Sequence, residues 1–145
     1  MPLSKHYLDL QTQRIQFDPV ALGHALEKIA EVEFAVLMGS AKEGVVNPHS
    51  DVDIAVYLSV PLKVELYVKI AECVTSQIGS DVRVDLGILN GADPVYRFEA
   101  LKGRLLFYRD EEVWLNFYSV TCREFETQMV HYERQRRYRL ERGVA

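Results

Sequence analysis

Apolar positions along the chain follow two periods, which indicates a protein built from both strands and helices. Period-two alternation or a short apolar run, each typical of a strand, occurs at residues 34–38, 51–58, 81–89 and 104–108. Helical spacing occurs in the segments between them, residues 18–32, 62–78 and 93–102. This succession predicts the α/β (α+β) class, in which helices cover the faces of one sheet.

Residues that suit helix ends stand at the borders of these segments. Asp18 and Asp93 each precede a proline, which combines a capping carboxylate with a favoured first helical residue. Gly79 and Gly103 follow the second and third helical segments, a position where glycine is favoured. The turn formers of residues 40–50 predict a loop that begins with a short helical turn.

Residues 110–140 contain neither proline nor glycine and carry apolar residues at helical spacing. The pattern predicts one long helix with at most one break. At 1.5 Å per residue this helix would extend on the order of 40 Å, which is longer than the small domain on which it packs. We therefore expect its far end to protrude or to meet a partner, in a homodimer or in a hetero-complex.

Length and composition fit a single domain. The 145 residues are 48% hydrophobic and 26% charged, and they contain no internal repeat or low-complexity tract. The pattern divides them into an N-terminal arm (1–17), a core (18–108) and a C-terminal helical segment (109–145).

Charge and cysteine content indicate which ligands and which cellular compartment to expect. A net charge of −4 argues against nucleic acid as a direct ligand, although five arginines fall between Arg134 and Arg142. Cys73 and Cys122 form no CxxC motif, and no stretch is apolar and long enough for a signal peptide or a membrane span. We expect a soluble cytoplasmic protein with reduced thiols.

Three carboxylates are placed so that they can converge. Asp51 and Asp53 lie on one face of a predicted strand, with Cβ atoms about 6–7 Å apart. Asp85 lies on the polar face of the following strand, so neighbouring strands would bring all three together. Like charges this close repel one another unless a cation neutralises them. Oxygen ligands of this kind suit Mg²⁺ or Mn²⁺.

A glycine–serine turn precedes these acids in the chain. Gly39 and Ser40 follow the apolar run 34–38; glycine lets backbone approach a ligand, and the amides that follow can hold an anion. Lys42 adds a positive charge. A phosphate-binding turn beside a divalent-metal site is the apparatus of nucleotidyl transfer, in which two metal ions stabilise the attacking and leaving oxygens.

Each of these motifs has a simpler interpretation when it is taken alone. A DxD pair is often a solvated strand start, a GS dipeptide carries no signal, and Asp85 could pair with Arg83. Ser50 could touch phosphate or only satisfy the backbone, and His49 could contact a nucleotide or be an ordinary loop residue. The combination of the motifs, in this order and context, favours the catalytic interpretation.

The combination resembles the polymerase-beta-type nucleotidyltransferase superfamily over about residues 20–108. The family signature is a glycine–serine turn after a strand, DxD on the next strand and a third carboxylate on a later strand, matched here by Gly39, Ser40, Asp51, Asp53 and Asp85. The short chain is similar to minimal nucleotidyltransferases (MNT), and the long helix after the segment GRLLF resembles their antitoxin subgroup. This resemblance implies the nucleotidyltransferase fold, a small mixed sheet flanked by helices.

Members of that subgroup are paired with HEPN-domain toxins, which are RNases. The resemblance implies that the chain uses ATP and Mg²⁺ (or Mn²⁺) to transfer AMP to a tyrosine of such a partner and so silences it. By the same resemblance, Asp51, Asp53 and Asp85 hold two metal ions, while Gly39 and Ser40 bind the triphosphate. Nucleotide contacts are also expected from Lys42 and Ser50. Lys42 replaces a usual arginine, and a lysine cannot make the bidentate phosphate contact of a guanidinium.

Two other functions stay open. The domain could neutralise a toxin by binding alone, with a vestigial metal site, although the intact carboxylates argue against this. It could also transfer a nucleotide to a small molecule or to RNA. The lack of a separate substrate domain argues against the first acceptor, and the net negative charge argues against the second.

Overall fold

The computed structural model of the chain describes residues 15–47 and 50–143. The elements in chain order are β1 (Ile15–Gln16), α2 (Pro19–Glu27), β2 (Val32–Met38), the 3₁₀ helix η1 (Gly39–Ala41), β3 (Val45–Val46), β4 (Val52–Leu58), α3 (Val64–Ile78), β5 (Val84–Ile88), α4 (Pro94–Leu101), β6 (Arg104–Tyr108) and α5 (Glu111–Glu141). The predicted α+β class is confirmed. Most of the expected N-terminal arm, and His49, lie outside the described residues.

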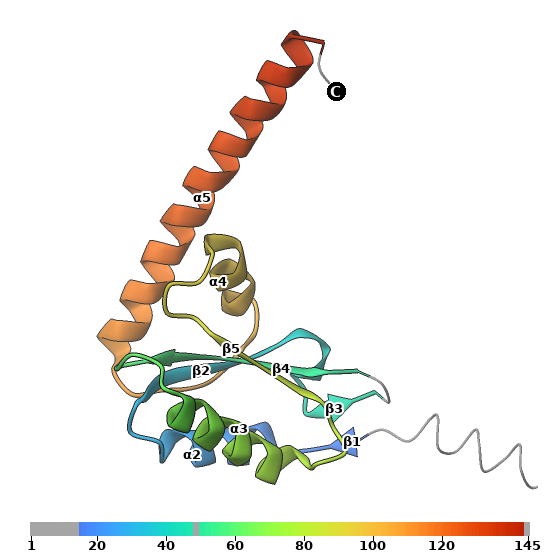
Figure 1. The fold of residues 1–145 in the computed structure, drawn as a ribbon, viewed down its shortest axis with the longest axis vertical. Coiled ribbons are helices and arrows are strands. Elements are labelled where there is room, and N and C mark those ends of the chain that lie inside the picture. Colours follow the sequence, from blue (N-terminus) through green and yellow to red (C-terminus); the bar gives the residue numbers. More distant parts are fainter. Residues whose placement is uncertain (1–14, 48–49, 144–145) are drawn as a thin grey trace, which may run out of the picture.

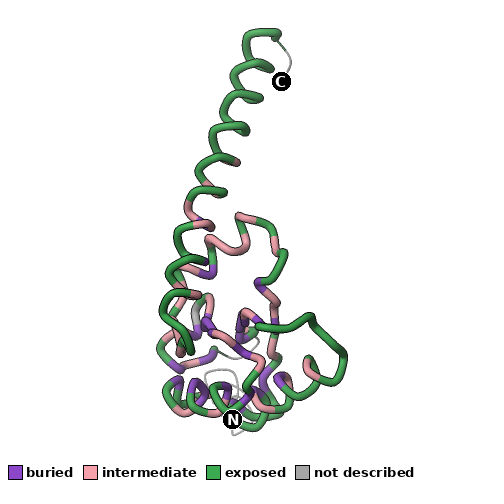
Figure 2. The backbone as a smooth tube through the Cα atoms, turned by 90° about the vertical axis from the view of Figure 1, so that its left-hand side faces the viewer, coloured by how far each residue is buried: buried purple, intermediate pink, exposed green. Residues whose placement is uncertain are grey.

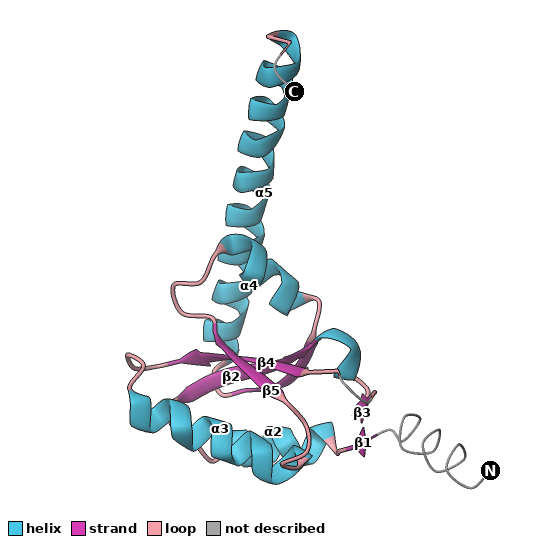
Figure 3. Cartoon of the chain, turned by 45° about the vertical axis from the view of Figure 1, so that its right-hand side comes forward, coloured by secondary structure: helices cyan, strands magenta, loops and turns pink. Residues whose placement is uncertain are grey.

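Four strands form the main sheet, in the order β5-β4-β2-β6. β4 runs parallel to β5, whereas β2 is antiparallel to both β4 and β6, so the sheet is mixed as expected. β1 and β3 form a separate antiparallel pair. Figures 1 and 3 show α2 and α3 on one face of the sheet and α4 and α5 on the other.

The alternation of β4 supplies both layers of the core. Val52 and Ile54 are completely buried in the cluster that joins the sheet to α2 and α3. Ala55 and Tyr57 point to the opposite face, into the cluster shared with α4 and α5. Asp53 belongs to this second face because side chains alternate along a strand.

The first helix is shorter than the sequence pattern predicted. α2 ends at Glu27, and Val32, expected at the helix end, begins β2. Arg109 holds the turn between the two elements. Its Nη2 donates hydrogen bonds to the carbonyl oxygens of Glu27 and Ile29, and its Nε donates to that of Val32. Arg109 stands 77 positions after Val32 in the chain. The helical spacing of residues 18–32 could not reveal this contact, so it predicted a longer helix.

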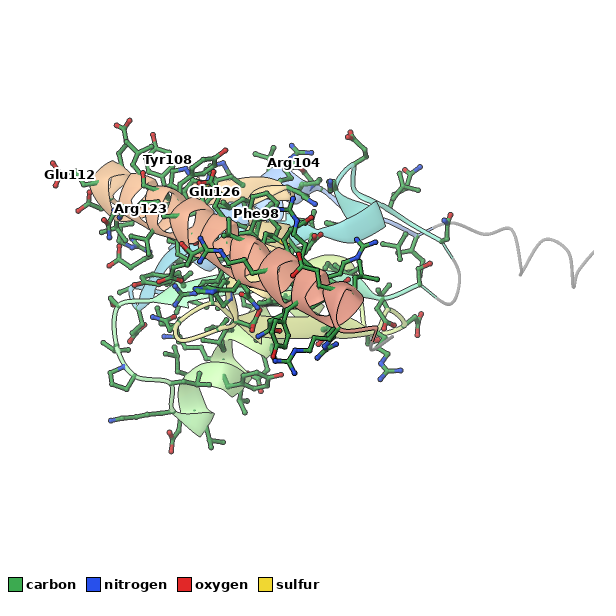
Figure 4. The ribbon with its side chains drawn as sticks, turned by 90° about the horizontal axis from the view of Figure 1, so that it is seen from above. Phe98, Arg104, Tyr108, Glu112, Arg123 and Glu126 are labelled. Atoms are coloured by element: carbon green, nitrogen blue, oxygen red, sulfur yellow. The ribbon has the colours of Figure 1, made fainter. Side chains whose placement is uncertain are left out.

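α5 runs through 31 residues without a break, or about 46 Å. Its first half packs on the domain through buried Phe117 and Thr121, and through Phe125, whose ring stacks on that of Phe98 in α4 with the ring centroids 3.9 Å apart. Figure 4 labels Phe98 and, on α5, Glu112, Arg123 and Glu126. The second half of α5 projects beyond the domain with exposed side chains (Figures 1 and 2). The expected protrusion of the C-terminal helix is confirmed.

None of the helices in the described part of the chain is both long enough and apolar enough to cross a membrane.

Candidate active site

Asp53 and Asp85 are direct neighbours across the parallel strands β4 and β5. Their α-carbons are register partners, and adjacent strands lie about 4.8 Å apart. Partners in a parallel pair point to the same face, so the two carboxylates lie side by side at the end of the sheet where β4 begins. Asp51 comes just before β4, two residues from Asp53. The condition set by the sequence pattern, that the two acid-bearing strands are neighbours, is met.

Asp85 and Asp51 act electrostatically on Asp53. The pKa of Asp53 is raised above its usual value, first because burial disfavours its charged form and then because Asp85 and Asp51 add negative charge nearby. A cation placed among these carboxylates would relieve that repulsion.

The side chains do not form a closed ligand set. No three or more His, Cys, Asp or Glu side chains within residues 15–47 and 50–143 are arranged to hold a metal ion. Asp51 Oδ1 lies 3.9 Å from Nε of Arg83 at the exposed rim of the site. The chemistry of the donors, three carboxylates that repel one another, nevertheless fits a hard divalent cation. Metal binding by Asp51, Asp53 and Asp85 therefore stays a prediction.

The glycine turn is built against Asp53. Met38 pairs with Asp53 across β2 and β4, and Gly39 follows it with a φ of 70°. A Cβ on Gly39 would lie 3.4 Å from Asp53 Oδ2. The left-handed φ suits glycine, and the missing side chain lets the backbone of η1 lie close to the carboxylate.

Lys42 and Ser50, both expected at the nucleotide, make backbone contacts in this structure. Nζ of Lys42 donates to the carbonyl oxygen of Lys102 at 2.9 Å, and Nη1 of Arg104 donates to that of Lys42 at 3.1 Å. These bonds fasten the chain after η1 to the α4–β6 connection. The amide of Ser50 donates to the carbonyl oxygen of Asn47.

Tyr96 of α4 is a residue of this site that sequence reasoning missed. A Cβ on Gly87 would overlap the Tyr96 hydroxyl, so the phenol lies directly over β5. The pKa of Tyr96 is raised by burial and then by the charges of Asp85 and Asp53. Glycine inside a strand often marks a close approach of another group, and Gly87 was the available signal.

The sheet, its paired carboxylates and the adjoining glycine turn define a domain of the nucleotidyltransferase class. The family model described as "Polymerase beta, Nucleotidyltransferase" matches residues 21–112, well over half of the chain. The chain belongs to this family. No curated protein is matched by the sequence.

Several solved structures have the same fold. A chain of a MntA–HepT toxin–antitoxin complex that carries two aspartate-to-glutamate substitutions is 22% identical, with a TM-score of 0.63 over 88% of this chain and 99% of its own. A chain from the complex of tri-AMPylated Shewanella oneidensis HEPN toxin with MNT antitoxin is 21% identical, with a TM-score of 0.55 over 88% of this chain and 100% of its own. At these identities the likeness establishes the fold.

Proposed function

We propose that this chain is a Mg²⁺-dependent nucleotidyltransferase that moves AMP from ATP to a tyrosine hydroxyl of a HEPN-domain RNase and thereby acts as its antitoxin. The observation that carries the proposal is the register pair Asp53–Asp85 beside the Gly39 turn, in a chain of the polymerase beta nucleotidyltransferase family. The likeness to chains from toxin–antitoxin complexes supports the partner class. The tri-AMPylated toxin in one of them supports the reaction.

In this proposal the three acids bind metal ions and the glycine turn binds the triphosphate. Asp51, Asp53 and Asp85 would hold two Mg²⁺ ions, which when bound neutralise charge on the phosphates and on the attacking oxygen. The backbone amides that follow Gly39, at Ser40 and beyond, would hold the triphosphate, because no side chain at residue 39 blocks the approach. The Lys42 ammonium has two further donors beside its bond to Lys102 and can also meet a phosphate oxygen.

The reaction is an in-line displacement at phosphorus. The phenolic oxygen of the partner's tyrosine forms a bond to the α-phosphorus of ATP, the bond from that phosphorus to the bridging oxygen breaks, and pyrophosphate leaves. The phenol proton passes to Asp85 or to solvent. Most of the acceleration would come from positioning and from charge neutralisation.

The projecting half of α5 suits the contact with the partner. Tyr132, Tyr138 and Leu140 are all more than half exposed there, beyond the reach of the core. Burial of these exposed apolar side chains against a second protein would be favourable in free energy. The same half carries the arginines between Arg134 and Arg142, which favour an acidic partner surface.

Intact-mass spectrometry tests the proposal. The protein encoded by the neighbouring gene is incubated with the chain, ATP and Mg²⁺, and in parallel with the Asp51→Ala/Asp53→Ala variant. Mass added in steps of AMP by the wild-type chain alone is the expected result. A stable complex without added mass would favour an antitoxin that acts by binding. Neither mass nor complex would favour a small-molecule or RNA acceptor.

A further inference from the structure

The site contains a hydroxyl to which the proposed mechanism assigns no role. Tyr96 is the third residue of α4, whose N-terminus is capped by the Asp93 side chain. This cap fixes the start of the helix over the face of the sheet that carries Asp53 and Asp85. The Tyr96 ring is partly buried in the cluster that joins this face to α4 and α5. Its position is therefore set by the core rather than by a free rotamer.

Register places the hydroxyl next to the acids. Gly87 follows Asp85 by two residues on the same face of β5, about 6.6 Å along the strand. It is the register partner of Ala55, just as Asp85 is the partner of Asp53. The Tyr96 hydroxyl occupies the space of a Cβ on Gly87. It thus forms the inner wall of the carboxylate pair, opposite the rim where Arg83 meets Asp51.

The chemistry of the hydroxyl suits a carboxylate neighbour. A phenol keeps its proton at neutral pH and is a hydrogen-bond donor. No hydrogen bond joins this hydroxyl to another residue in the part of the chain that the structure describes. A carboxylate has two oxygens, so one that gives an oxygen to a metal ion still has an oxygen to accept a hydrogen bond.

We propose that Tyr96 is a positioning residue for Asp85: when metal is bound, the hydroxyl, which has no hydrogen-bond partner among the described residues here, donates a hydrogen bond to the Asp85 carboxylate and holds it in the orientation that binds metal beside Asp53. This inference rests on the proposed function of the three acids. Partners of metal-binding side chains fix the orientation of these ligands, and their removal commonly weakens metal affinity by about 10–100-fold.

Mn²⁺ affinity tests this role without any partner protein. The free Mn²⁺ concentration is followed by electron paramagnetic resonance in titrations of the full chain with a non-hydrolysable ATP analogue. Tyr96→Phe keeps the ring and removes only the hydroxyl, so we expect about a 10-fold weaker affinity at an unchanged melting temperature. The matched control is Tyr57→Phe, which removes a hydroxyl from the same core cluster four residues beyond Asp53. It should leave Mn²⁺ affinity unchanged.

A second variant, in strand β5, tests the position of the same hydroxyl. Gly87→Ala places a methyl group where the hydroxyl lies, and this methyl also comes within 2.9 Å of the ring carbon Cζ. It should displace the phenol and reproduce the loss of Mn²⁺ affinity. Wild-type affinity in both Tyr96→Phe and Gly87→Ala overturns the positioning role.

The outcomes separate this inference from the proposed function. A wild-type chain that binds no Mn²⁺ overturns both. A chain that binds Mn²⁺ but transfers no AMP overturns the proposed reaction, while the affinity of Tyr96→Phe still decides the role of Tyr96.

Discussion

Gly39 and Asp53 meet across the antiparallel pair β2–β4, where a Cβ on Gly39 would lie 3.4 Å from Asp53 Oδ2. The turn proposed to hold phosphate and an acid proposed to hold metal are therefore one structural unit. A side chain at residue 39 would point at the carboxylate and occupy the approach proposed for a Mg²⁺–triphosphate. The proposed requirement for glycine here has two parts, a backbone conformation and an open space for this ligand.

Gly39→Ala separates these two parts when it is compared with Gly91→Ala. Both glycines have nearly the same left-handed φ, 70° and 69°, so each substitution should cost about 1–2 kcal/mol in the free energy of unfolding. Only Gly39 faces Asp53, whereas nothing lies within 4 Å of a Cβ on Gly91. We expect AMP transfer to fall at least tenfold in Gly39→Ala alone. Urea denaturation and intact-mass assays measure the two effects, and equal activity losses would contradict the proposed role of the turn.

Asp53→Asn should leave the protein at least as stable as the wild type at neutral pH while abolishing transfer. The pKa of Asp53 is raised in the folded state by burial and by the charges of Asp85 and Asp51. The folded state therefore binds this proton more tightly than the unfolded state, and stability falls as pH rises from about 3.8 through the raised value. At neutral pH the cost of the charge is fully present, and asparagine removes it.

Thermal melts in EDTA between pH 3 and pH 7.5 (roughly the window in which carboxylates titrate) check the sign. The advantage of Asp53→Asn over the wild type should be small at the acid end and should grow with pH. Asp81→Asn is the control, since Asp81 is exposed in the turn before β5 and should show no such trend. Severe unfolding of Asp53→Asn would instead indicate that this carboxylate is structural.

Mg²⁺ with a non-hydrolysable ATP analogue should raise the melting temperature of the wild-type chain. A ligand that binds only the folded state at 100 times its Kd stabilises that state by about 2.7 kcal/mol. Asp51→Asn/Asp53→Asn retains the shape of the site but loses two of the three carboxylates. An equal shift in this variant, measured by scanning calorimetry, would place the metal elsewhere.

Most helices and strands of the fold could be predicted from residues that are close together in the sequence. Asp18 and Asp93 cap α2 and α4 as their sequence context predicted, and both capping hydrogen bonds are formed. The alternation of apolar and polar residues in β4 correctly predicted which side chains lie on each face of the sheet, because successive side chains of a strand point to opposite faces. The pairing of Asp53 with Asp85 needed only the assumption that the two strands are adjacent.

Contacts between distant residues were not accessible in the same way. The two-residue strand Val45–Val46 was missed because it exists only through its pairing with Ile15–Gln16. The early end of α2 depends on Arg109, and the place of Tyr96 depends on the packing of α4 over Gly87. The spacing of apolar residues within one helix or strand carries no information about such contacts. Only the structure therefore revealed that Tyr96 forms the inner wall of the site.

Removal of residues 134–145 should leave the domain intact and weaken its association with the proposed HEPN-domain partner. Residues 134–143 are all exposed along the end of α5, and surface changes away from a core alter the free energy of unfolding by no more than about 0.5 kcal/mol. Size-exclusion chromatography and calorimetric titration with the partner would measure the loss of affinity.

The charge of this segment can be tested apart from its length. Replacing the five arginines between Arg134 and Arg142 with glutamine keeps the helix but removes its positive charge. If the partner surface is acidic, this variant should associate more slowly, and the difference from wild type should shrink as salt is raised, because exposed charges are screened. The matching replacement with lysine should retain most of the association rate. Unchanged affinity after truncation would exclude the end of α5 from the interface, and a clearly lower melting temperature would show that it supports the core instead.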